Sequence, residues 1–419
     1  MSALLFVNAA QVVTCAGAPR ARRGGEMADA GVLTGDVAVA VDDGRIVAVG
    51  DREDVARTVP GAAEVDCAGR LLTPGLVDSH THAVFGRARY DEQELRAAGV
   101  GYMEIARRGG GIHASVRDLR ARSDDELVAL TLPRLARLAS YGATTVEVKS
   151  GYGLSVHDEL RTLDVIRRLQ ELTPLRLVAT WMGAHEIPHE FRESAVARAD
   201  YVRLLIEEML PRVVAQGVAS FADVFCEPGV FTIEESRNLL DAARAAGLGL
   251  KLHADELETS GGAELAAELG AASADHLAAI SPEGIRRLAA SQTVATLLPG
   301  TMFFLGRPRQ APARELIAAG AAVSLATDLN PGTSPTVNLP LILTLGVSQL
   351  HMSVAEVMVA ATVNGAAALG LADRTGQLAP GFAADLALFD AEDVRELPYW
   401  YGDRLCRATW VRGQPCHRQ

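Results

Sequence analysis

The sequence predicts an α/β protein with a TIM-like (β/α)8 barrel and a small β-sandwich-like domain that both ends of the chain build together. The middle of the chain alternates eight short apolar runs with amphipathic helical stretches, whereas both ends alternate apolar runs with turns. The 419 residues are also more than one ordinary core needs. We therefore expect the barrel over residues 74–368 and the small domain from residues 1–73 and 369–419.

The two ends of the chain share a β-rich pattern. Between residues 1 and 73, turns separate short apolar runs, and Asp42-Asp43-Gly44 between two such runs is typical of a β-hairpin. Residues 376–390 and 409–413 repeat the pattern near the other end. Two β-rich ends around a different middle favour one sheet domain assembled from both.

The middle of the chain contains candidate strands separated by helix-start signals. Three segments have capping-box spacing, in which a hydroxyl and a carboxylate three residues later satisfy free N–H groups of a first helical turn. Ser281-Pro282 places a cap before a proline at the first helical position. An open, doubly wound sheet is the alternative, but the sequence has no G-x-G-x-x-G after a first strand and no P-loop. The strands are 75–78, 144–149, 176–181, 221–225, 249–253, 273–276, 293–297 and 322–327, and the capping boxes are Ser123/Glu126, Thr232/Glu235 and Ser353/Glu356.

The composition excludes several classes of partner. A net charge of −12 argues against nucleic acid and anionic membranes, and no apolar run is long enough to span a bilayer. The five cysteines are odd in number and widely spaced, which predicts reduced thiols in a cytoplasmic protein. Only two of the 40 basic residues are lysines, Lys149 and Lys251. Both lie in predicted strands, where a buried ion pair is favoured over direct catalysis.

Histidines gather at the ends of the predicted barrel strands. A barrel places its catalytic groups at the C-terminal ends of its strands. Alternate residues of a strand share a face, so the imidazoles of His80 and His82 should both point toward the barrel axis. Five of the ten histidines lie at these ends, namely His80, His82, His185, His253 and His276.

We expect four of the side chains at these ends to bind one divalent metal ion. Imidazole nitrogen and carboxylate oxygen suit zinc or ferrous iron at neutral pH. His80 and His82 after the first strand, His253 in the fifth and Asp328 after the eighth would surround one ion and leave a position open for water. Each residue alone is more typical of a core or capping position, but their placement at one end of the barrel favours a metal site.

The segment around the first two histidines resembles the amidohydrolase superfamily. The match is P-G-L-V-D-S-H-T-H at residues 74–82. Further segments resemble one family of this superfamily, the enzymes that open the imidazolone ring in histidine degradation, and K-S-G-Y-G-L and N-P-G-T are the most specific of them. The sequence departs from the family at Leu329, where an aromatic residue is expected, and in an arginine-rich segment over residues 18–32. The further segments are residues 84–89, 149–154, 183–185, 222–227, 253–256, 298–301 and 328–333.

This resemblance implies a reaction and the residues that carry it. The substrate would be 4-imidazolone-5-propanoate, a small molecule with a carboxylate tail, and hydrolysis of its ring C–N bond would give N-formimino-L-glutamate. The metal would be zinc or iron on the four ligands named above, and the enzyme would be a homodimer. The substrate-binding residues would be Arg89, Tyr152, His185, Glu256, Asn330, Gly332 and Thr333.

Three side chains are candidates for the proton transfers of such a hydrolysis. Glu256 lies three residues after His253, and we assign it as general base and proton shuttle, with orientation of a histidine as the alternative. Asp328 is expected to share the proton transfer. His276 is expected to donate a hydrogen bond to the oxygen of the tetrahedral intermediate, and a structural role or a fifth metal ligand are its alternatives.

The carboxylate tail requires a fixed cation and hydrogen-bond donors. Arg89, on the loop after the first strand, is expected to bind the carboxylate as a fork, and a solvated arginine is the alternative. Tyr152 and His185 offer donors for the rest of the ligand. Residues 330–333 are typical of a turn, which at the barrel mouth would present backbone N–H groups to a ligand.

Three other functions remain as alternatives. A mononuclear deaminase of cytosine- or guanine-type rings would share the metal ligands but would not need Arg89 and Tyr152 for a carboxylate tail. A two-metal hydrolase would use a carboxylated lysine on the fourth strand, whereas that strand ends near Cys226-Glu227 and Lys149 lies on the second, which favours one metal. A barrel scaffold without catalysis should lack the metal ligands, which this chain keeps.

Overall fold

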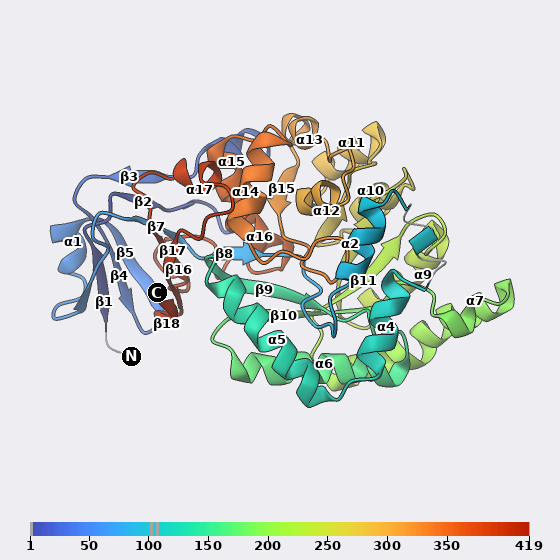
Figure 1. Cartoon of the computed structure of the whole chain (residues 1–419). Helices are drawn as coiled ribbons and strands as arrows, with labels where there is room; N and C mark the ends of the chain where they lie inside the picture. The colour runs from blue at the N-terminus through green and yellow to red at the C-terminus, as the bar shows by residue number, and fades with distance from the viewer. Residues whose placement is uncertain (1–2, 101–103, 106–108, 419) are drawn as a thin grey trace.

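The centre of the fold is a parallel barrel (Figure 1). The fold is taken from a computed structural model, which describes residues 3–100, 104–105 and 109–418. Eight strands follow one another in chain order around the sheet, and their ends differ from the predicted ends by no more than three residues. The predicted barrel is therefore confirmed. Its strands are β8 (Leu76–Asp78), β9 (Ala143–Lys149), β10 (Arg176–Ala184), β11 (Phe221–Cys226), β12 (Gly249–Ala254), β13 (Ser273–His276), β14 (Val294–Leu297) and β15 (Ala322–Leu325).

The barrel closes between β8 and the segment that follows β15. The Asp78 carboxylate accepts hydrogen bonds from the amide of Thr327 at 2.9 Å and from its hydroxyl at 2.6 Å. Beyond this contact, Thr81 and Leu329 form an isolated parallel bridge. The segments that carry the predicted ligands of the first and eighth strands therefore lie side by side.

Helices surround the barrel, and several begin where the sequence predicts. The Ser123 hydroxyl accepts the N–H of Glu126 while the Glu126 carboxylate accepts the N–H of Ser123, and the same capping box begins α9 and α15. Ser281 caps α11, with Pro282 in its first turn. The helices are α1 (Arg52–Ala56), α2 (Tyr90–Ala97), α4 (Ile112–Arg120), α5 (Asp124–Ala139), α6 (Val156–Leu172), α7 (Ala195–Leu204), α8 (Leu210–Gln216), α9 (Ile233–Ala245), α10 (Gly262–Leu269), α11 (Pro282–Ala290), α12 (Pro299–Phe304), α13 (Ala313–Ala319), α14 (Leu339–Ser348), α15 (Val354–Ala360), α16 (Val363–Ala368) and α17 (Glu396–Tyr399).

Strands from both ends of the chain build the small β domain (Figure 1). Its four-stranded sheet has the order β5-β4-β1-β6, and its six-stranded sheet has the order β18-β17-β16-β7-β2-β3. Apolar side chains of the two sheets share one core, in which the rings of Phe6 and Trp410 meet edge to face at 5.0 Å. The predicted hairpin joins β4 to β5, and Asp43 and Gly44 have the positive φ of a type I′ turn. The strands are β1 (Leu4–Val7), β2 (Gln11–Val13), β3 (Val32–Thr34), β4 (Val37–Asp42), β5 (Arg45–Asp51), β6 (Ala63–Asp66), β7 (Leu71–Pro74), β16 (Leu386–Phe389), β17 (Cys406–Val411) and β18 (Gln414–Arg418).

The chain passes from the small domain to the barrel through one residue, Gly75, between β7 and β8. A Cβ at Gly75 would lie 2.2 Å from the side chain of Thr144 on β9, so the close approach of this link to β9 requires glycine here. The division of the chain at residues 73 and 368 stays a prediction, and residues 1, 2 and 419 lie outside the described residues. In the described part of the chain, no helix combines the length and the apolar character needed to cross a membrane.

Candidate metal centre and active site

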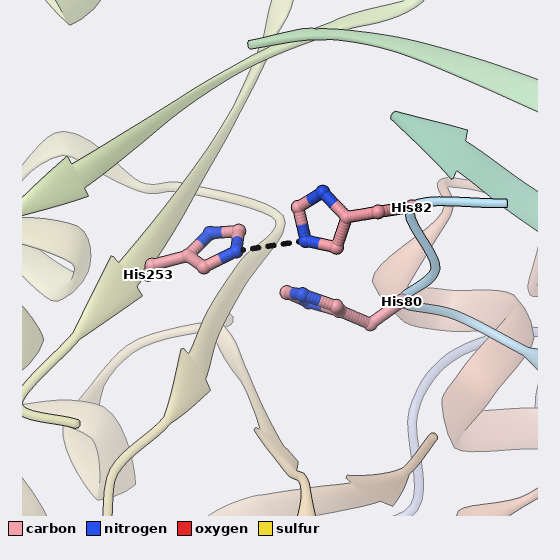
Figure 2. A group of neighbouring side chains, drawn as sticks. All are labelled: His80, His82 and His253. Atoms are coloured by element: carbon pink, nitrogen blue, oxygen red, sulfur yellow. Dashed lines mark hydrogen bonds between the residues drawn. The ribbon is translucent and has the colours of Figure 1, made fainter. Parts of the chain in front are cut away.

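Three of the predicted metal ligands meet at the mouth of the barrel (Figure 2). Their ring nitrogens lie within 4.8 Å of one another, and the Nε2 atoms of His82 and His253 are 3.3 Å apart. The buried Nε2 of His80 has no hydrogen-bond partner among the described residues. This contact is a hydrogen bond when one of the two rings carries its proton on Nε2, and when neither does, the nitrogens can instead bind a shared cation. The arrangement of the three imidazoles therefore fits a bound metal ion.

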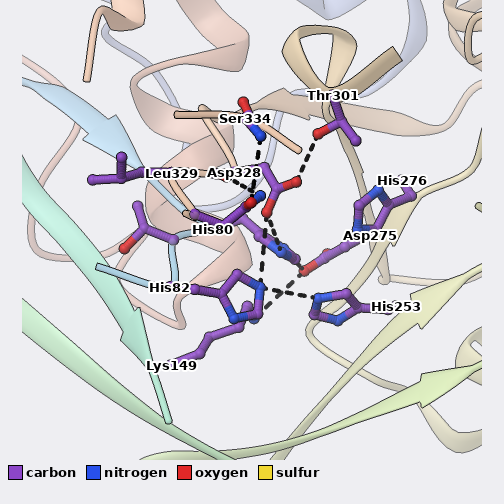
Figure 3. A network of polar contacts seen from close by, with 12 residues as sticks. His80, His82, Lys149, His253, Asp275, His276, Thr301, Asp328, Leu329 and Ser334 are labelled. Carbon is purple, nitrogen blue, oxygen red and sulfur yellow. Dashed lines mark hydrogen bonds and ion pairs between the residues drawn. The ribbon is translucent and has the colours of Figure 1, made fainter. Parts of the chain in front are cut away.

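The fourth predicted ligand, Asp328, lies beside this group (Figure 3). Its Oδ1 atom is 3.5 Å from Nε2 of His80 and 3.7 Å from Nε2 of His82. Its Oδ2 atom accepts a hydrogen bond from the Thr301 hydroxyl at 2.6 Å, which fixes the carboxylate. Three imidazole nitrogens and one carboxylate oxygen are a donor set that suits zinc or iron.

Burial sets the protonation states that this site needs. Burial lowers the pKa of His80 and of His82 well below the ordinary value, so both rings are neutral, as metal ligation requires. Burial also raises the pKa of Asp328 to about 6, against the opposing effect of the hydrogen bond from Thr301. A cation beside this carboxylate would favour its ionised form.

Two buried aspartates orient the imidazoles from behind. Nδ1 of His80 is 2.6 Å from Oδ2 of Asp275, and Nδ1 of His253 is 3.1 Å from Oδ1 of Asp223. These contacts direct the Nε2 atoms toward the centre of the predicted metal site. Sequence reasoning did not assign this role to either aspartate. The sequence did offer a signal for this role, since Asp223 and Asp275 are charged residues within predicted buried parallel strands, where apolar residues are the rule.

A cavity of about 280 Å³ opens above the predicted metal ligands. This volume suits a small polar molecule. Three further basic residues line the cavity that the sequence did not predict as site residues, namely His113, Arg192 and Arg307. The structure describes all twelve predicted site residues. Ten of them line the cavity, whereas His80 and Gly332 do not. The predicted lining residues are His82, Arg89, Tyr152, His185, His253, Glu256, His276, Asp328, Asn330 and Thr333.

Glu256 and His276 form a pair at this cavity. Oε2 of Glu256 lies 3.6 Å from Nε2 of His276. Burial, reinforced by the negative charge of Asp328, raises the pKa of Glu256 well above its ordinary value. The Glu227 carboxylate fixes the backbone of residues 256–258, because it accepts their three N–H groups, with that of Glu256 at 3.1 Å. A positioned carboxylate with a raised pKa can accept a proton and return it.

Arg89 precedes α2 and is fixed from two sides. Its Nη1 donates to the Ser115 hydroxyl at 3.0 Å, and its Nε lies 3.3 Å from a carboxylate oxygen of Glu92. The residue is only 9% exposed, which excludes the alternative of a solvated arginine. Gly332 lies against it, because a Cβ at this position would be 1.6 Å from Nη2 of Arg89. Gly332 thus gives Arg89 its space rather than contacting the cavity.

The predicted turn over residues 330–333 is present, but its N–H groups are used internally. Oδ1 of Asn330 accepts the N–H of Gly332 at 2.9 Å and that of Thr333 at 2.7 Å. The expectation that this turn presents backbone N–H groups to a ligand is therefore wrong for these two residues. An asparagine side chain that closes its own turn leaves no such donor free.

Tyr152 and His185 pack against two of the predicted metal ligands, His82 and His253. The rings of His185 and His82 are stacked with centroids 4.8 Å apart, and the Tyr152 ring lies 5.3 Å from that of His185. Nδ1 of His185 is 2.9 Å from the carbonyl oxygen of Gly151, and this contact fixes the imidazole. Both side chains are buried at the cavity wall, where they are able to contact a ligand.

The two lysines lie beneath the histidines and are fully buried. Lys149 pairs with Asp223 at 2.6 Å, and Lys251 pairs with Glu147 at 3.0 Å. The expectation of buried ion pairs is confirmed. Lys149 lies on β9, the second barrel strand, and the fourth barrel strand is β11, which ends at Cys226. The strand assignment behind the single-metal prediction is therefore also confirmed.

Comparison with known proteins agrees with this site. A model of the amidohydrolase family matches residues 105–417, well over half of the chain. The chain therefore belongs to the amidohydrolase family.

Two relatives extend over nearly the whole chain. An imidazolonepropionase of Symbiobacterium thermophilum is 50% identical over 415 residues, which cover 98% of this chain and 96% of the relative. An imidazolonepropionase of Bacillus velezensis is 48% identical over 418 residues, with coverage of 98% and 96%. Within the amidohydrolases, the chain belongs with the imidazolonepropionases.

Solved structures share the fold at low sequence identity. A 5-methylcytosine deaminase from Klebsiella pneumoniae with bound 5-fluorocytosine has a TM-score of 0.73 at 20% identity, covering 99% of this chain and 97% of that chain. An adenosine deaminase from Xanthomonas campestris with bound zinc has a TM-score of 0.72 at 20% identity, with coverage of 99% and 93%. These similarities concern the fold alone.

Proposed function

We propose that this protein hydrolyses 4-imidazolone-5-propanoate to N-formimino-L-glutamate, with one zinc or iron ion bound by His80, His82, His253 and Asp328. The observation that carries the proposal is this donor set at one wall of a small cavity that a buried arginine also lines. Imidazolonepropionase relatives along nearly the whole chain support the same reaction. When bound, the metal supplies Lewis acidity that activates water and polarises the ring carbonyl.

Glu256 carries the proton transfers in this proposal. Its carboxylate accepts a proton from the attacking water, whose oxygen bonds to the carbonyl carbon of the ring. The C–N bond at that carbon then breaks, and Glu256 returns the proton to the departing nitrogen, which remains in the formimino group. Asp328 shares this transfer, and His276, 3.6 Å from Glu256, donates a hydrogen bond to the oxygen of the tetrahedral intermediate.

The propanoate tail binds to the guanidinium of Arg89. This side chain is preoriented by Ser115 and Glu92, so little conformational freedom is lost when the carboxylate binds. Tyr152 and His185 contact the rest of the ligand from the cavity wall. Asn330 shapes the turn that brings Thr333 to the cavity, and Gly332 leaves room for Arg89.

The direct test is product analysis with the purified protein loaded with zinc or iron. Incubation with 4-imidazolone-5-propanoate should give N-formimino-L-glutamate by mass spectrometry, whereas cytosine and guanine should remain unchanged. The deaminase alternative would instead release ammonia from a free base. An absence of turnover by metal-loaded protein would favour the scaffold alternative and contradict the proposal.

We also propose that the protein works as a homodimer in the cytoplasm. All five cysteines are free and four of them are buried, which supports a reducing compartment. Light scattering of the purified protein tests the dimer, and a monomeric mass at micromolar concentration would contradict it.

A further inference from the structure

A cluster of five buried charged side chains lies beneath the metal ligands. It contains both lysines of the chain and three carboxylates, and each side chain is at most 1% exposed. The members come from four barrel strands, namely β9 and, on the other side of β10, the adjacent strands β11, β12 and β13. They are Lys149, Lys251, Glu147, Asp223 and Asp275.

The two ammonium groups join all three carboxylates. Nζ of Lys149 is 2.6 Å from Asp223 and 2.8 Å from Glu147. Nζ of Lys251 is 3.0 Å from Glu147 and donates to the carbonyl of Ser79 at 3.0 Å. Both Nζ atoms lie 3.8 Å from Oδ2 of Asp275, and Figure 3 shows the contact from Lys149.

The same carboxylates hold two of the metal ligands. Asp275 contacts Nδ1 of His80 at 2.6 Å, and Asp223 contacts Nδ1 of His253 at 3.1 Å. A carboxylate that accepts the proton of Nδ1 leaves the lone pair of Nε2 free for a metal. Each of these histidines is therefore connected to a lysine through one carboxylate.

The two ammonium groups neutralise two of the three carboxylates of the cluster. Two ammonium groups against three carboxylates leave one negative charge, and Asp328 supplies a second. Removal of either ammonium group would leave an unneutralised carboxylate in a region that water does not reach, which is strongly unfavourable. A carboxylate in that position would turn away or take up a proton, and it would no longer orient its histidine.

The ammonium groups also lie against a second group of side chains that could hold a cation. His80, Glu147 and Asp275 offer three ligand atoms within 4.8 Å of one another, which is a second group able to hold a cation. The ammonium group of Lys251 is 3.0 Å from Glu147 and 3.8 Å from Asp275, and thus lies against two members of that group. A metal ion there would have to displace this lysine.

We propose that Lys149 and Lys251 are positioning residues for the metal centre. They neutralise and orient the carboxylates that hold His80 and His253, and they take the place of a second metal ion. This inference rests on the metal site of the proposed function.

The test measures zinc binding, independently of turnover. Lys149→Met and Lys251→Met remove one charge each at similar side-chain length, and affinity for Zn²⁺ is measured by competition with a chromophoric chelator. We expect roughly ten- to hundredfold weaker binding of the first zinc ion in each variant. The double variant Glu147→Gln/Lys251→Met keeps the net charge of the cluster, and it should recover at least part of the affinity lost in Lys251→Met.

A matched control removes a cation at the other end of the barrel. Arg176, at the start of β10, pairs with the buried Asp385 at 2.8 Å. Arg176→Met should lower Tm and leave the zinc affinity unchanged. An equal loss of zinc affinity in this control would show that the lysines have only a general structural role, which would overturn the inference. Unchanged zinc affinity in both lysine variants would also overturn it. Wild-type protein that binds no zinc would instead contradict the metal site itself.

A measurement on the wild-type protein covers the case in which a lysine variant fails to fold. Because the chain has two lysines, ¹⁵N-lysine labelling gives two side-chain signals, both belonging to this cluster. We expect two ammonium signals protected from solvent exchange, and both should shift when Zn²⁺ is added to metal-free protein. Signals that do not respond to zinc would overturn the inference.

Discussion

Replacement of Gly332 by alanine should weaken substrate binding without affecting the metal centre. The new Cβ would lie 1.6 Å from Nη2 and 2.2 Å from Cζ of Arg89. Nonbonded heavy atoms prefer separations of roughly 3.5–4 Å, so the guanidinium must move by about 2 Å. That movement breaks its contacts with Ser115 at 3.0 Å and Glu92 at 3.3 Å. The guanidinium then no longer lies at the position proposed to bind the propanoate carboxylate.

The size of the effect follows from the charge pair that is lost. Truncating one partner of a buried, hydrogen-bonded charge pair costs about 2–4 kcal/mol, which corresponds to roughly a 30- to 1000-fold lower kcat/KM. The contact involves the tail and not the reacting bond, so KM should rise more than kcat falls. Arg89→Ala should cause a similar loss, and the double variant Gly332→Ala/Arg89→Ala should be little worse than either, because both changes remove the same contact.

Kinetics and zinc content of these variants, measured together, test the reasoning. Gly25→Ala is the matched control, since a Cβ at this exposed glycine meets no atom within 4 Å and KM should not change. The explanation that Gly332 acts through Arg89 is refuted if Gly332→Ala keeps the wild-type KM. It is equally refuted if the losses of the two single variants add in full.

Three further predictions concern the metal, the proton transfer and the fold. His253→Ala should lose bound metal and turnover together, and a variant that retains one ion per chain by elemental analysis would show that His253 is not a ligand. Glu256→Gln should keep its metal and lose roughly 100- to 10,000-fold in kcat. Because burial raises the pKa of Glu256 and only the ionised form accepts a proton, wild-type kcat should fall as the pH drops through that raised pKa, and the variant should lack this acid limb. Ser123→Ala removes the N-cap of α5 and should cost about 1 kcal/mol of stability, seen as a small drop in Tm with unchanged kcat/KM.

The elements of the fold could be predicted because their signals are local. The capping box of Ser123 and Glu126 and the hairpin turn at Asp43 and Gly44 each depend on a few consecutive residues. The barrel strands are short apolar runs between such signals. The chain order of the strands around the sheet then follows, because short helical connections join parallel neighbours.

The interactions around the candidate site could not be predicted in the same way, because they join residues from distant strands. The sequence indicates that Lys149 is buried, but not that its ammonium group meets Asp223 at 2.6 Å. The turn after β15 was expected to offer N–H groups to a ligand, and only the position of the Asn330 side chain shows that they are used within the turn. Arg192 and Arg307 line the cavity, yet in a chain so rich in arginine no local pattern marks them.

The seam of the barrel, where β8 meets the segment after β15, explains why the predicted metal ligands lie together. Among the described strands, β8 and β15 are the two ends of the hydrogen-bonded order, so closure depends on the segments beyond them. There the N–H of Asp328 donates to the carbonyl of His80 at 3.0 Å, and the N–H of His82 donates to the carbonyl of Leu329 at 2.8 Å. Asp328 adopts a positive φ of 53° at this point, a conformation that a non-glycine residue keeps only where its surroundings impose it. The backbone contacts that close the barrel therefore also bring a carboxylate beside two imidazoles before any metal binds. A metal bound to both sides of the seam would in turn favour the closed barrel, because it binds the folded chain and not the unfolded one.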